Sequence, residues 1–536
     1  MTNVVIFLAD DLGYSDIGCY GGEIKTPNID SLAARGVRMS NFHNTPRCSP
    51  SRASLLTGLH PHQTGMGILA NDDSAEGGYT GKLNDRCITL AEILKEEGFT
   101  TAIRGKWHLT PSNRVPDDAW PTNRGFDTFW GTMTGCGTYY QPGTLTRGTE
   151  NIDHEADREG FFYTDVIADQ SVDFLKSHKS ESPDKPYFLY VPFTAPHWPL
   201  HAREKTIAEY DGVYEAGWDK LRETRLKRQK ELGLLPEYLE LSPRDEGVPS
   251  WENEAHKEWQ VRCMQVYAAM VTEMDRAIGQ ILEQIRANGD WEDTVILFMS
   301  DNGASADPMP LTELQYWRQR TDILRHKTKD GRDVRIGNDP LVMPGGEDTY
   351  LSYGRGWANL SNTPFKLFKL WAHEGGVATP FIAHWPQGKL RTGEIFEQPF
   401  QLTDVMPTLL ELLGAQYPSE RAGVPLPPLA GQSMFGTWKG ADVGNPTLWW
   451  EHCGNAAIRS GQWKLVRQYD CPWELYDINV DRSELRDLSA QHPEVVQELE
   501  AKWQAIATQN GVIPFRQIMD IYYNKNLVMN AHLAIQ

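Results

Sequence analysis

The sequence predicts an α/β fold built around a mostly parallel β-sheet, followed by a small α+β unit near the C-terminus. Short apolar runs rich in β-branched residues alternate with amphipathic stretches through most of the chain, which is typical of strands and helices that follow one another in turn. After about residue 435, short strand-like segments follow one another without helices between them. The 536 residues are 40% hydrophobic and 23% charged, which is a globular composition and excludes a disordered or low-complexity chain.

Four buried strands are predicted where a short, continuous apolar run ends in a polar turn. These runs cover residues 4–9, 100–104, 187–193 and 294–299. Apolar residues recur at helical spacing over residues 28–36, 89–98, 261–282 and 405–413. Three of these predicted helices stop at a glycine, namely Gly36, Gly98 and Gly414.

Two domains are predicted, a large one over residues 1–435 and a C-terminal α+β subdomain over residues 436–536. The smaller one contains three short strands and a polar amphipathic helix, at residues 447–451, 456–459, 463–467 and about 493–508. A stretch rich in Pro and Gly, residues 415–440, is the predicted connection. The large domain also carries a basic helical insertion at 221–234 and an irregular stretch at 301–356. Loops of that length tend to build sites or interfaces.

The charge balance limits the choice of partners. The chain has 72 acidic and 52 basic residues and a net charge of −20, which argues against a nucleic-acid partner because binding phosphates needs a basic face. The N-terminal apolar run is short and has no basic start, and no run approaches the roughly 20 apolar residues that span a bilayer. We therefore expect a soluble, cytoplasmic protein with no membrane partner. The seven cysteines include no CxxC pair, which excludes a zinc framework and a disulfide scaffold.

Polar side chains follow two of the predicted strands. Asp10 and Asp11 come directly after residues 4–9, and Asp301 and Asn302 follow the strand that begins at residue 294. Because ligands bind beyond the carboxyl ends of strands in open α/β sheets, these oxygens point to a site for a hard cation, Ca²⁺ or Mg²⁺. The alternative, that an aspartate after a strand only caps a turn, stays equally open on spacing alone.

A second constellation is Cys48-Ser49-Pro50-Ser51-Arg52, which leads into an apolar stretch that stops at Gly58. Ser49 can cap a helix and Pro50 suits its first turn, so Cys48 is predicted at a helix N-terminus, where the helix dipole favours anions. Arg52 follows one turn later. A capped surface helix with a buried cysteine explains the same residues equally well.

Together with other stretches in the same order, this segment resembles the signature of the type I sulfatases. The resemblance rests on these motifs: Ala9-Asp10-Asp11-Leu12-Gly13, Cys-Ser-Pro-Ser-Arg with Leu-x-Thr-Gly, Gly105-Lys106-Trp107-His108-Leu109, Ala195-Pro196-His197-Trp198-Pro199, Ser300-Asp301-Asn302-Gly303, Lys369, and His373-Glu374-Gly375-Gly376. The likeness runs through most of the chain and is greatest to soluble bacterial arylsulfatases. It implies an alkaline-phosphatase-like large mixed sheet sandwiched by helices, with residues 1–435 as the catalytic domain.

The resemblance also implies a role for each matching residue. The cysteine of this motif is converted to formylglycine in that family, so Cys48 is the predicted modified residue. The metal ligands would be Asp10, Asp11, Asp301, Asn302 and the modified Cys48. The metal would be Ca²⁺, with Mg²⁺ or Mn²⁺ as alternatives. The catalytic set would be Cys48, Arg52, Lys106, His108, His197 and Lys369. Of these, Arg52, Lys106, His197 and Lys369 would also bind the substrate.

The chemistry explains why the family needs this set. One hydroxyl of the hydrated aldehyde attacks sulfur, and His197 or Lys369 protonates the leaving group. His108 then deprotonates the second hydroxyl, which expels sulfate and restores the aldehyde. Lys106 and His108, two apart on a predicted strand, are expected to share a face. One departure from the family pattern is the stretch Val377–Pro380, which lacks an arginine, and we expect it to change local packing rather than catalysis.

The predicted activity is hydrolysis of small sulfate monoesters, aryl sulfates above all. The alternatives are hydrolysis of phosphonate or phosphate esters at the same site, and a non-catalytic protein that only binds anions. A formylglycine-generating maturation enzyme is an expected partner. The apolar clusters in residues 516–536 predict a homo-oligomer contact through the C-terminal tail, because an exposed apolar tail would be a liability.

Overall fold

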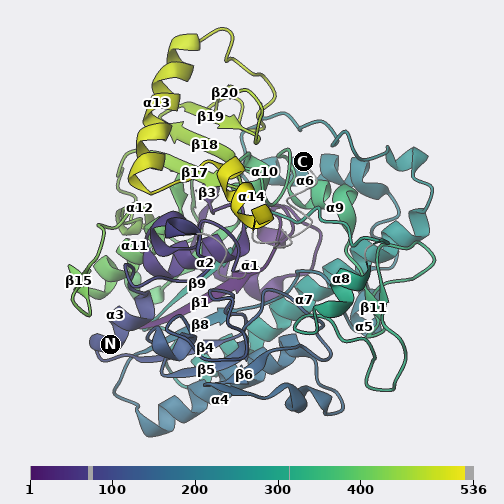
Figure 1. Ribbon diagram of the computed structural model, residues 1–536, viewed down its shortest axis with the longest axis vertical. Helices are drawn as coiled ribbons and strands as arrows, with labels where there is room; N and C mark the ends of the chain where they lie inside the picture. The colour runs from purple at the N-terminus through teal and green to yellow at the C-terminus, as the bar shows by residue number, and fades with distance from the viewer. Residues whose placement is uncertain (1, 71–75, 313, 525–536) are drawn as a thin grey trace.

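A ten-stranded mixed sheet forms the centre of the protein (Figure 1). The computed structural model describes residues 2–70, 76–312 and 314–524. In spatial order the strands are β13 (Ile395–Phe396), β2 (Val37–Met39), β12 (Phe381–His384), β9 (Thr294–Ser300), β1 (Asn3–Ala9), β8 (Tyr187–Pro192), β4 (Thr100–Arg104), β5 (Thr128–Thr132), β6 (Leu145–Arg147) and β7 (Glu150–Asn151). The five central strands from β9 to β5 run parallel, which confirms the predicted class.

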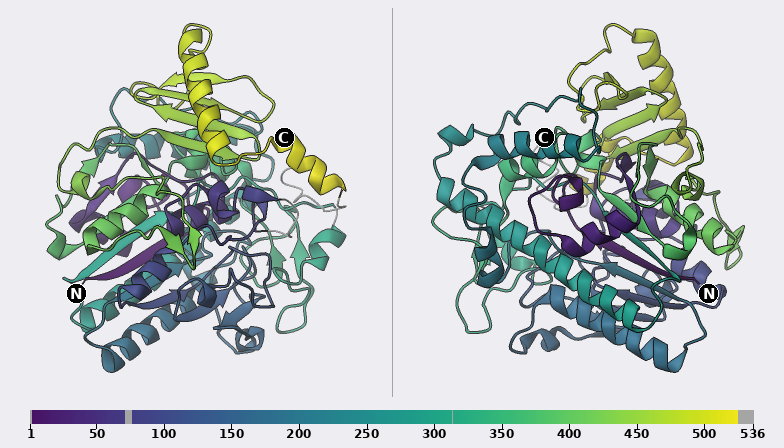
Figure 2. Two further views of the ribbon diagram at one scale, coloured as in Figure 1. Left: turned by 60° about the vertical axis from the view of Figure 1, so that its left-hand side comes forward. Right: turned by 180° about the vertical axis from the view of Figure 1, so that it is seen from behind.

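Helices cover both faces of this sheet. Side chains along β1 point to the two faces in turn, and both sets are buried. Val5, Phe7 and Ala9 belong to one hydrophobic cluster, and the residues between them belong to another on the opposite face. On the first face lie α1 (Pro27–Arg35), α4 (Tyr163–Glu181) and α7 (Lys257–Ala287), the last two side by side (Figure 2). On the second lie α2 (Cys48–Thr57), α3 (Leu90–Glu96) and α11 (Val405–Leu413). The alkaline-phosphatase-like sandwich is therefore confirmed.

The predicted strands and helices occur with small shifts in their ends. The basic insertion forms α6 (Gly217–Glu231), and the irregular stretch contains α8 (Leu314–Gln319), β10 (Arg335–Ile336) and β11 (Thr349–Tyr350), followed by α9 (Gly354–Ser361). The sheet is less parallel than the local patterns predicted. After a long connection the chain returns to the sheet at the edge where the parallel strands end. β12 therefore runs antiparallel to both β9 and β2.

The C-terminal unit is a four-stranded antiparallel sheet, at the top of Figure 1. Its strands are β17 (Leu448–His452), β18 (Asn455–Ser460), β19 (Trp463–Arg467) and β20 (Glu474–Asp477). One face packs against α13 (Pro493–Gln509) through Trp449 and Trp503. The other face, which includes Trp450, packs against Ala372 and Val377 of the large domain. An antiparallel sheet with a packed helix was the prediction, and it is confirmed; the boundary at residue 435 stays a prediction.

A buried cluster of charged side chains joins the two units. Glu374, fully buried at the start of α10 (Glu374–Val377), accepts hydrogen bonds from Lys464 Nζ at 2.8 Å and Arg482 Nε at 2.8 Å. His43 Nε2 lies 3.2 Å from the same carboxylate, and Lys464 also pairs with Glu484 at 2.9 Å. Burial alone would raise the pKa of Glu374, but Lys464, His43 and Arg482 hold it well below its usual value.

We expect Lys464→Met to lower the free energy of unfolding by about 3–5 kcal/mol, because it leaves two buried carboxylates with too few cations. Chemical denaturation would measure the loss. Lys502→Met, which removes a lysine on the exposed side of α13, serves as the control and should change stability by less than about 0.5 kcal/mol. An equal effect of the two changes would contradict a stabilising role for the buried cluster.

The C-terminal tail packs on its own chain as far as the structure describes it. In α14 (Phe515–Asn524), Ile518 is fully buried and, with Phe515, packs against Ile68 and Leu370. Tyr523 is 83% exposed. The predicted oligomer contact at Leu527-Val528-Met529 lies outside the described residues, so a homo-oligomer stays a prediction.

Candidate active site

The order of the central strands brings the predicted site residues together. β9, β1, β8 and β4 are neighbours, and all four point their carboxyl ends to the same edge of the sheet. Ala9 pairs with Ser300, so the segments after β1 and β9 start side by side. The backbone N–H of Lys106 donates to Pro192 O at 2.8 Å, which ties the loop after β4 to the end of β8. Four distant segments thus meet at one point.

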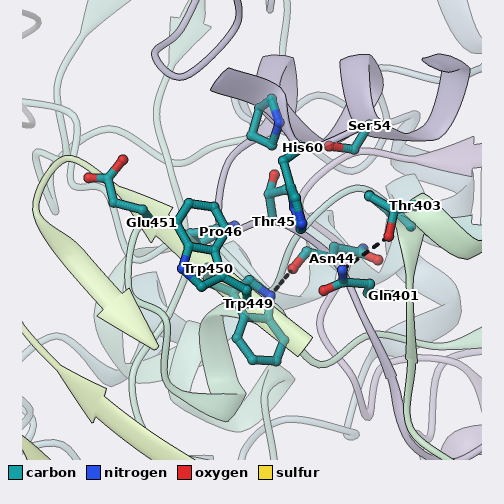
Figure 3. A pocket seen from close by; sticks show the side chains of 12 residues that line it. Asn44, Thr45, Pro46, Ser54, His60, Gln401, Thr403, Trp449, Trp450 and Glu451 are labelled. Carbon is teal, nitrogen blue, oxygen red and sulfur yellow. Dashed lines mark hydrogen bonds between the residues drawn. The ribbon is translucent and has the colours of Figure 1, made fainter. Parts of the chain in front are cut away.

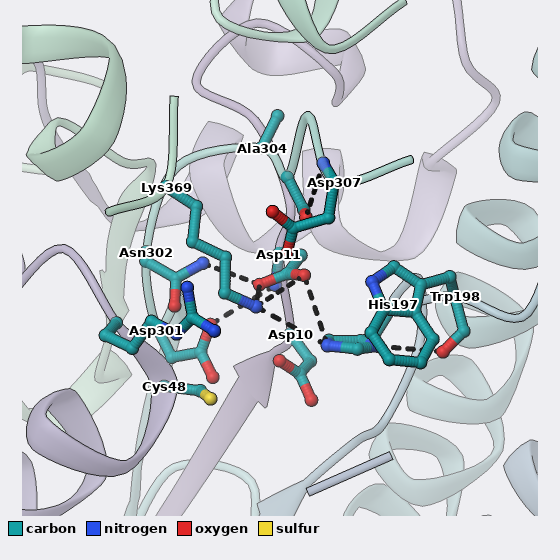
Figure 4. Close-up of polar contacts among 12 residues, drawn as sticks. Asp10, Asp11, Cys48, His197, Trp198, Asp301, Asn302, Ala304, Asp307 and Lys369 are labelled. Carbon is teal, nitrogen blue, oxygen red and sulfur yellow. Dashed lines mark hydrogen bonds and ion pairs between the residues drawn. The ribbon is translucent and has the colours of Figure 1, made fainter. Parts of the chain in front are cut away.

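Two polar pairs, Asp10-Asp11 and Asp301-Asn302, form the centre of the site (Figure 4). The backbone N–H of Asp11 donates to Asp301 Oδ1 at 3.2 Å, and Asn302 Nδ2 donates to Asp11 Oδ1 at 2.6 Å. Asp10 and Asp301 are fully buried. Asp11 has a φ of 62°, a left-handed conformation that few non-glycine residues adopt and that concentrates at functional sites.

Three basic side chains pair with these carboxylates. Arg52 Nη2 lies 2.9 Å from Asp301 Oδ2 and 3.5 Å from Asp10 Oδ2. Lys106 Nζ donates to Asp10, and Lys369 Nζ donates to both oxygens of Asp11 at 2.7 and 2.9 Å. Each of the three cations therefore has at least one carboxylate of this group as its partner.

The two predicted histidines lie on different sides of this group. His197 Nε2 is 3.4 Å from Lys369 Nζ and 3.4 Å from Asp11 Oδ2, while its Nδ1 lies 2.7 Å from Trp198 O. The carbonyl can only accept, so Nδ1 carries the proton and Nε2 is left free to accept one. His108 Nδ1 lies 3.5 Å from Cys48 Sγ. One histidine therefore faces the metal-ligand candidates, and the other faces the predicted nucleophile.

The residues of α2 are all buried, and the helix starts two residues earlier than predicted. Cys48 is its first residue, after Arg47 as the N-cap, and Gly58 ends it at a φ of 67° as expected. Ser49 does not cap the helix; its hydroxyl accepts a hydrogen bond from the backbone of Ala70 at 3.2 Å instead. Cys48 is only 2% exposed and sits where the first N–H groups of the helix are free of helical partners.

The prediction that Lys106 and His108 share one face of a strand is wrong. β4 ends at Arg104, and both residues lie in the loop that follows it, where His108 has a φ of 58°. The turn sends the two side chains to different partners, Lys106 to Asp10 and His108 to Cys48. Both still belong to the site, but loop geometry rather than strand alternation places them there.

Burial and the local charges set the protonation states of the site. Burial and the neighbouring Asp10 raise the pKa of Asp301 to about 7. Burial lowers the pKa of His197 to about 3, although Asp11 opposes this shift. Burial, together with Lys106 and Arg52, lowers the pKa of His108 well below its usual value. Both histidines are therefore neutral near pH 7 and able to accept a proton.

A family model described as Sulfatase matches residues 2–415. The chain belongs to the sulfatase family. A second model, described as N-sulphoglucosamine sulphohydrolase, C-terminal, matches residues 365–509. The sulfatase is 34% identical to an uncharacterized sulfatase from Schizosaccharomyces pombe, with 95% of this chain and 94% of that protein aligned. It is also 34% identical to an arylsulfatase from Klebsiella aerogenes, over 81% of this chain and 91% of the relative. The protein is therefore a sulfuric ester hydrolase.

Solved structures share the fold of this sulfatase. A structure titled Ps i-CgsB in complex with k-i-k-neocarrahexaose aligns with a TM-score of 0.66 at 24% identity, covering 95% of this chain and 93% of the other. A phosphonate monoester hydrolase from Agrobacterium radiobacter aligns with a TM-score of 0.57 at 19% identity, covering 95% and 96%. At these identities the likeness concerns the fold alone. No described helix is both long and apolar enough to cross a membrane.

The acidic group of this sulfatase fits the divalent metal that the family generally uses. Asp10 Oδ1 and Asn302 Oδ1 are buried and have no hydrogen-bond partner among the described residues. Buried oxygens without partners cost free energy, and a cation would satisfy them. Ligand atoms of Asp10, Asp11 and His197 also lie within 4.8 Å of one another. Carboxylate and amide oxygens suit Ca²⁺, Mg²⁺ or Mn²⁺.

Two residues that the sequence analysis missed support the histidines of the sulfatase. A Cβ on Gly135 would come within 2.3 Å of His108 Cε1, so only glycine leaves room for that ring. Tyr139 donates its hydroxyl proton to His197 O at 2.9 Å. The paired glycines at positions 135 and 137 were a signal for a close approach of the backbone; no pattern singled out Tyr139.

Proposed function

We propose that this sulfatase hydrolyses small sulfate monoesters, aryl sulfates among them, with Cys48 converted to formylglycine and a divalent cation, Ca²⁺ by preference, held by Asp10, Asp11, Asp301 and Asn302. The observation that carries the proposal is the convergence of three cations, three buried carboxylates and two neutral histidines at one edge of the sheet, beside the buried Cys48. The hydrated aldehyde would supply an oxygen nucleophile with a second hydroxyl, and the cation would stabilise negative charge on the oxygens.

The sulfate group would be held by the basic side chains around the acidic group. Arg52, Lys106 and Lys369 reach the site from α2, from the loop after β4 and from the segment before α10. Their ammonium and guanidinium groups are donors without acceptor capacity, so they suit sulfate oxygens and the charge that develops during transfer. A cation on the carboxylates would release these donors from their present partners.

The histidines suit the two proton transfers. His197 and Lys369, 3.4 Å apart, are placed to deliver a proton to the leaving oxygen, with Lys369 as its source. Burial would lower the pKa of Lys369, but Asp11 more than reverses this shift, so the amine keeps its proton until that carboxylate is otherwise engaged. His108, neutral and 3.5 Å from Cys48, is placed to accept a proton from residue 48.

A turnover screen tests the proposal. We expect kcat/KM to be highest for 4-nitrophenyl sulfate, at least about tenfold above 4-nitrophenyl phosphate and a 4-nitrophenyl phosphonate monoester. Peptide mass across Thr45–Arg52 in the same preparation should show the aldehyde or its hydrate. Preferred turnover of the phosphonate would assign the site to phosphonate esters. Full turnover with only a thiol at Cys48 would contradict the formylglycine, and no turnover by fully converted protein would favour a binding protein.

A further inference from the structure

Arg47, beside the site, has no partner for its charge within the part of the chain that the structure describes. Arg47 is the N-cap of α2 and only 4% exposed, yet its Nε and Nη1 atoms are buried without a hydrogen-bond partner among the described residues. The three other cations of the site each pair with a carboxylate, whereas no ion pair of Arg47 is found among the described residues. A buried, unpaired guanidinium is costly, and such a group is usually paired or bound to a ligand.

Arg47 lies between the candidate site and the C-terminal unit. Burial and the positive charge of Arg47 both lower the pKa of His452, at the end of β17. The same charge acts on Lys369 in the site and on Cys453 in the turn after β17. Arg47 directly precedes Cys48 as the N-cap of α2, so its backbone lies at the candidate site.

Strand β17 also holds the backbone that leads to Arg47 (Figure 3). Trp450 Nε1 donates to Asn44 O at 2.8 Å, and the backbone N–H of Leu370 donates to Pro46 O at 2.7 Å. The segment before α2 is thus fixed from both sides. An arginine on so rigid a support keeps its position without an ion-pair partner, which suits a preorganised binding group.

We propose that Arg47 binds a second oxyanion group of the substrate, a carboxylate or a further sulfate, beside the sulfate that is cleaved. The inference rests on the proposed function and deepens it, since it names sulfate esters with two negative charges as preferred substrates. The buried Nε and Nη1 of Arg47 are donors without acceptor capacity, so they suit the oxygens of a carboxylate or a sulfate.

Three aryl sulfates test the inference: 4-nitrophenyl sulfate, its ring-carboxylated analogue and a nitrocatechol disulfate. We expect the wild type to prefer one or both of the doubly charged esters. Comparing these two esters shows whether Arg47 recognises a carboxylate or a sulfate. Arg47→Gln should reduce that preference in kcat/KM by roughly tenfold to a hundredfold, mainly through KM. Arg47→Gln should also raise the melting temperature of the free enzyme, because it removes an unpaired buried charge. A merely structural arginine would lower it.

Arg222→Gln is the matched control. Arg222 is 2% exposed in α6, and its Nη2 donates to Ser242 O and Oγ at 2.8 Å. Losing it should lower the melting temperature and leave the substrate preference unchanged. Equal turnover of all three esters by the wild type would overturn the inference while the proposed function stands. An equal loss on all three in Arg47→Gln would overturn it too, by placing Arg47 on the transferred sulfate. A wild type that cleaves none overturns both proposals.

Discussion

Cys48→Ser and Cys48→Ala should each lose sulfate-ester turnover by a factor of roughly 10⁴ to 10⁶, the range seen when a nucleophile is removed. Cys48 is the side chain at which α2, His108 and the basic group converge. Serine offers one hydroxyl and no second one, so a sulfated serine would have no internal route to release sulfate. We expect Cys48→Ser to be no better than Cys48→Ala in steady-state turnover.

The measurement is kcat for 4-nitrophenyl sulfate, with protein produced alongside a maturation enzyme. Cys471→Ser is the control, since Cys471 is an exposed thiol in the C-terminal unit and should be dispensable. Thermal unfolding should show both Cys48 variants folded, because a serine or alanine at a 2% exposed position alters little volume. Wild-type rates in Cys48→Ser would rule out the proposed aldehyde.

Asp301→Asn should lower kcat/KM by about 10³-fold or more and abolish the rise in melting temperature that Ca²⁺ produces in the wild type. Asp301 is fully buried, and an amide in its place lacks the negative charge that a divalent cation requires. The same substitution also frees Arg52 from its ion pair at 2.9 Å. Activity of the wild type should vanish with a chelator and return with added cation.

Asp404→Asn separates this effect from the loss of any buried carboxylate. Burial raises the pKa of Asp404 to about 7, as it does for Asp301, but Asp404 accepts hydrogen bonds from the backbone of Gln401 and Gln432. The Asp404→Asn variant should keep the rise in melting temperature that Ca²⁺ produces. A wild type that stays active after chelation, or an Asp301→Asn variant with an unchanged Ca²⁺ response, would contradict the assigned cation site.

The helices, the strands and most residues of the candidate site could be predicted from the sequence. Buried strands and glycine-stopped helices leave strong local patterns, so β1, β4, β8 and β9 could be predicted within a residue or two. Polar pairs at strand ends then predicted Asp10 and Asp301 as site residues, and the family resemblance added His197. The structure brings these residues together because the parallel neighbours β9, β1 and β8 share one edge.

What escaped prediction depends on contacts between distant segments. The antiparallel β12 has the same apolar pattern as a parallel strand, so its direction had no local signal. The ring of His108, which lies in a left-handed turn, has room only because residue 135 is a glycine. Gly135 lies in the connection after β5, far from His108 in the chain. The segment that leads to Arg47 meets β17 only when the C-terminal sheet docks on it, and Arg47 carries no pattern of its own.

The burial of α2 also sets the timing of any chemistry performed on it by another protein. All ten residues from Cys48 to Thr57 are buried, and Cys48 itself is covered by the loop that carries His108. Another protein could reach the Cys48 sulfur only if this helix and that loop opened. We therefore expect the proposed conversion of Cys48 to occur on the nascent or unfolded chain. Production rate and chaperone supply, rather than incubation of the finished protein, would then determine what fraction of molecules is active.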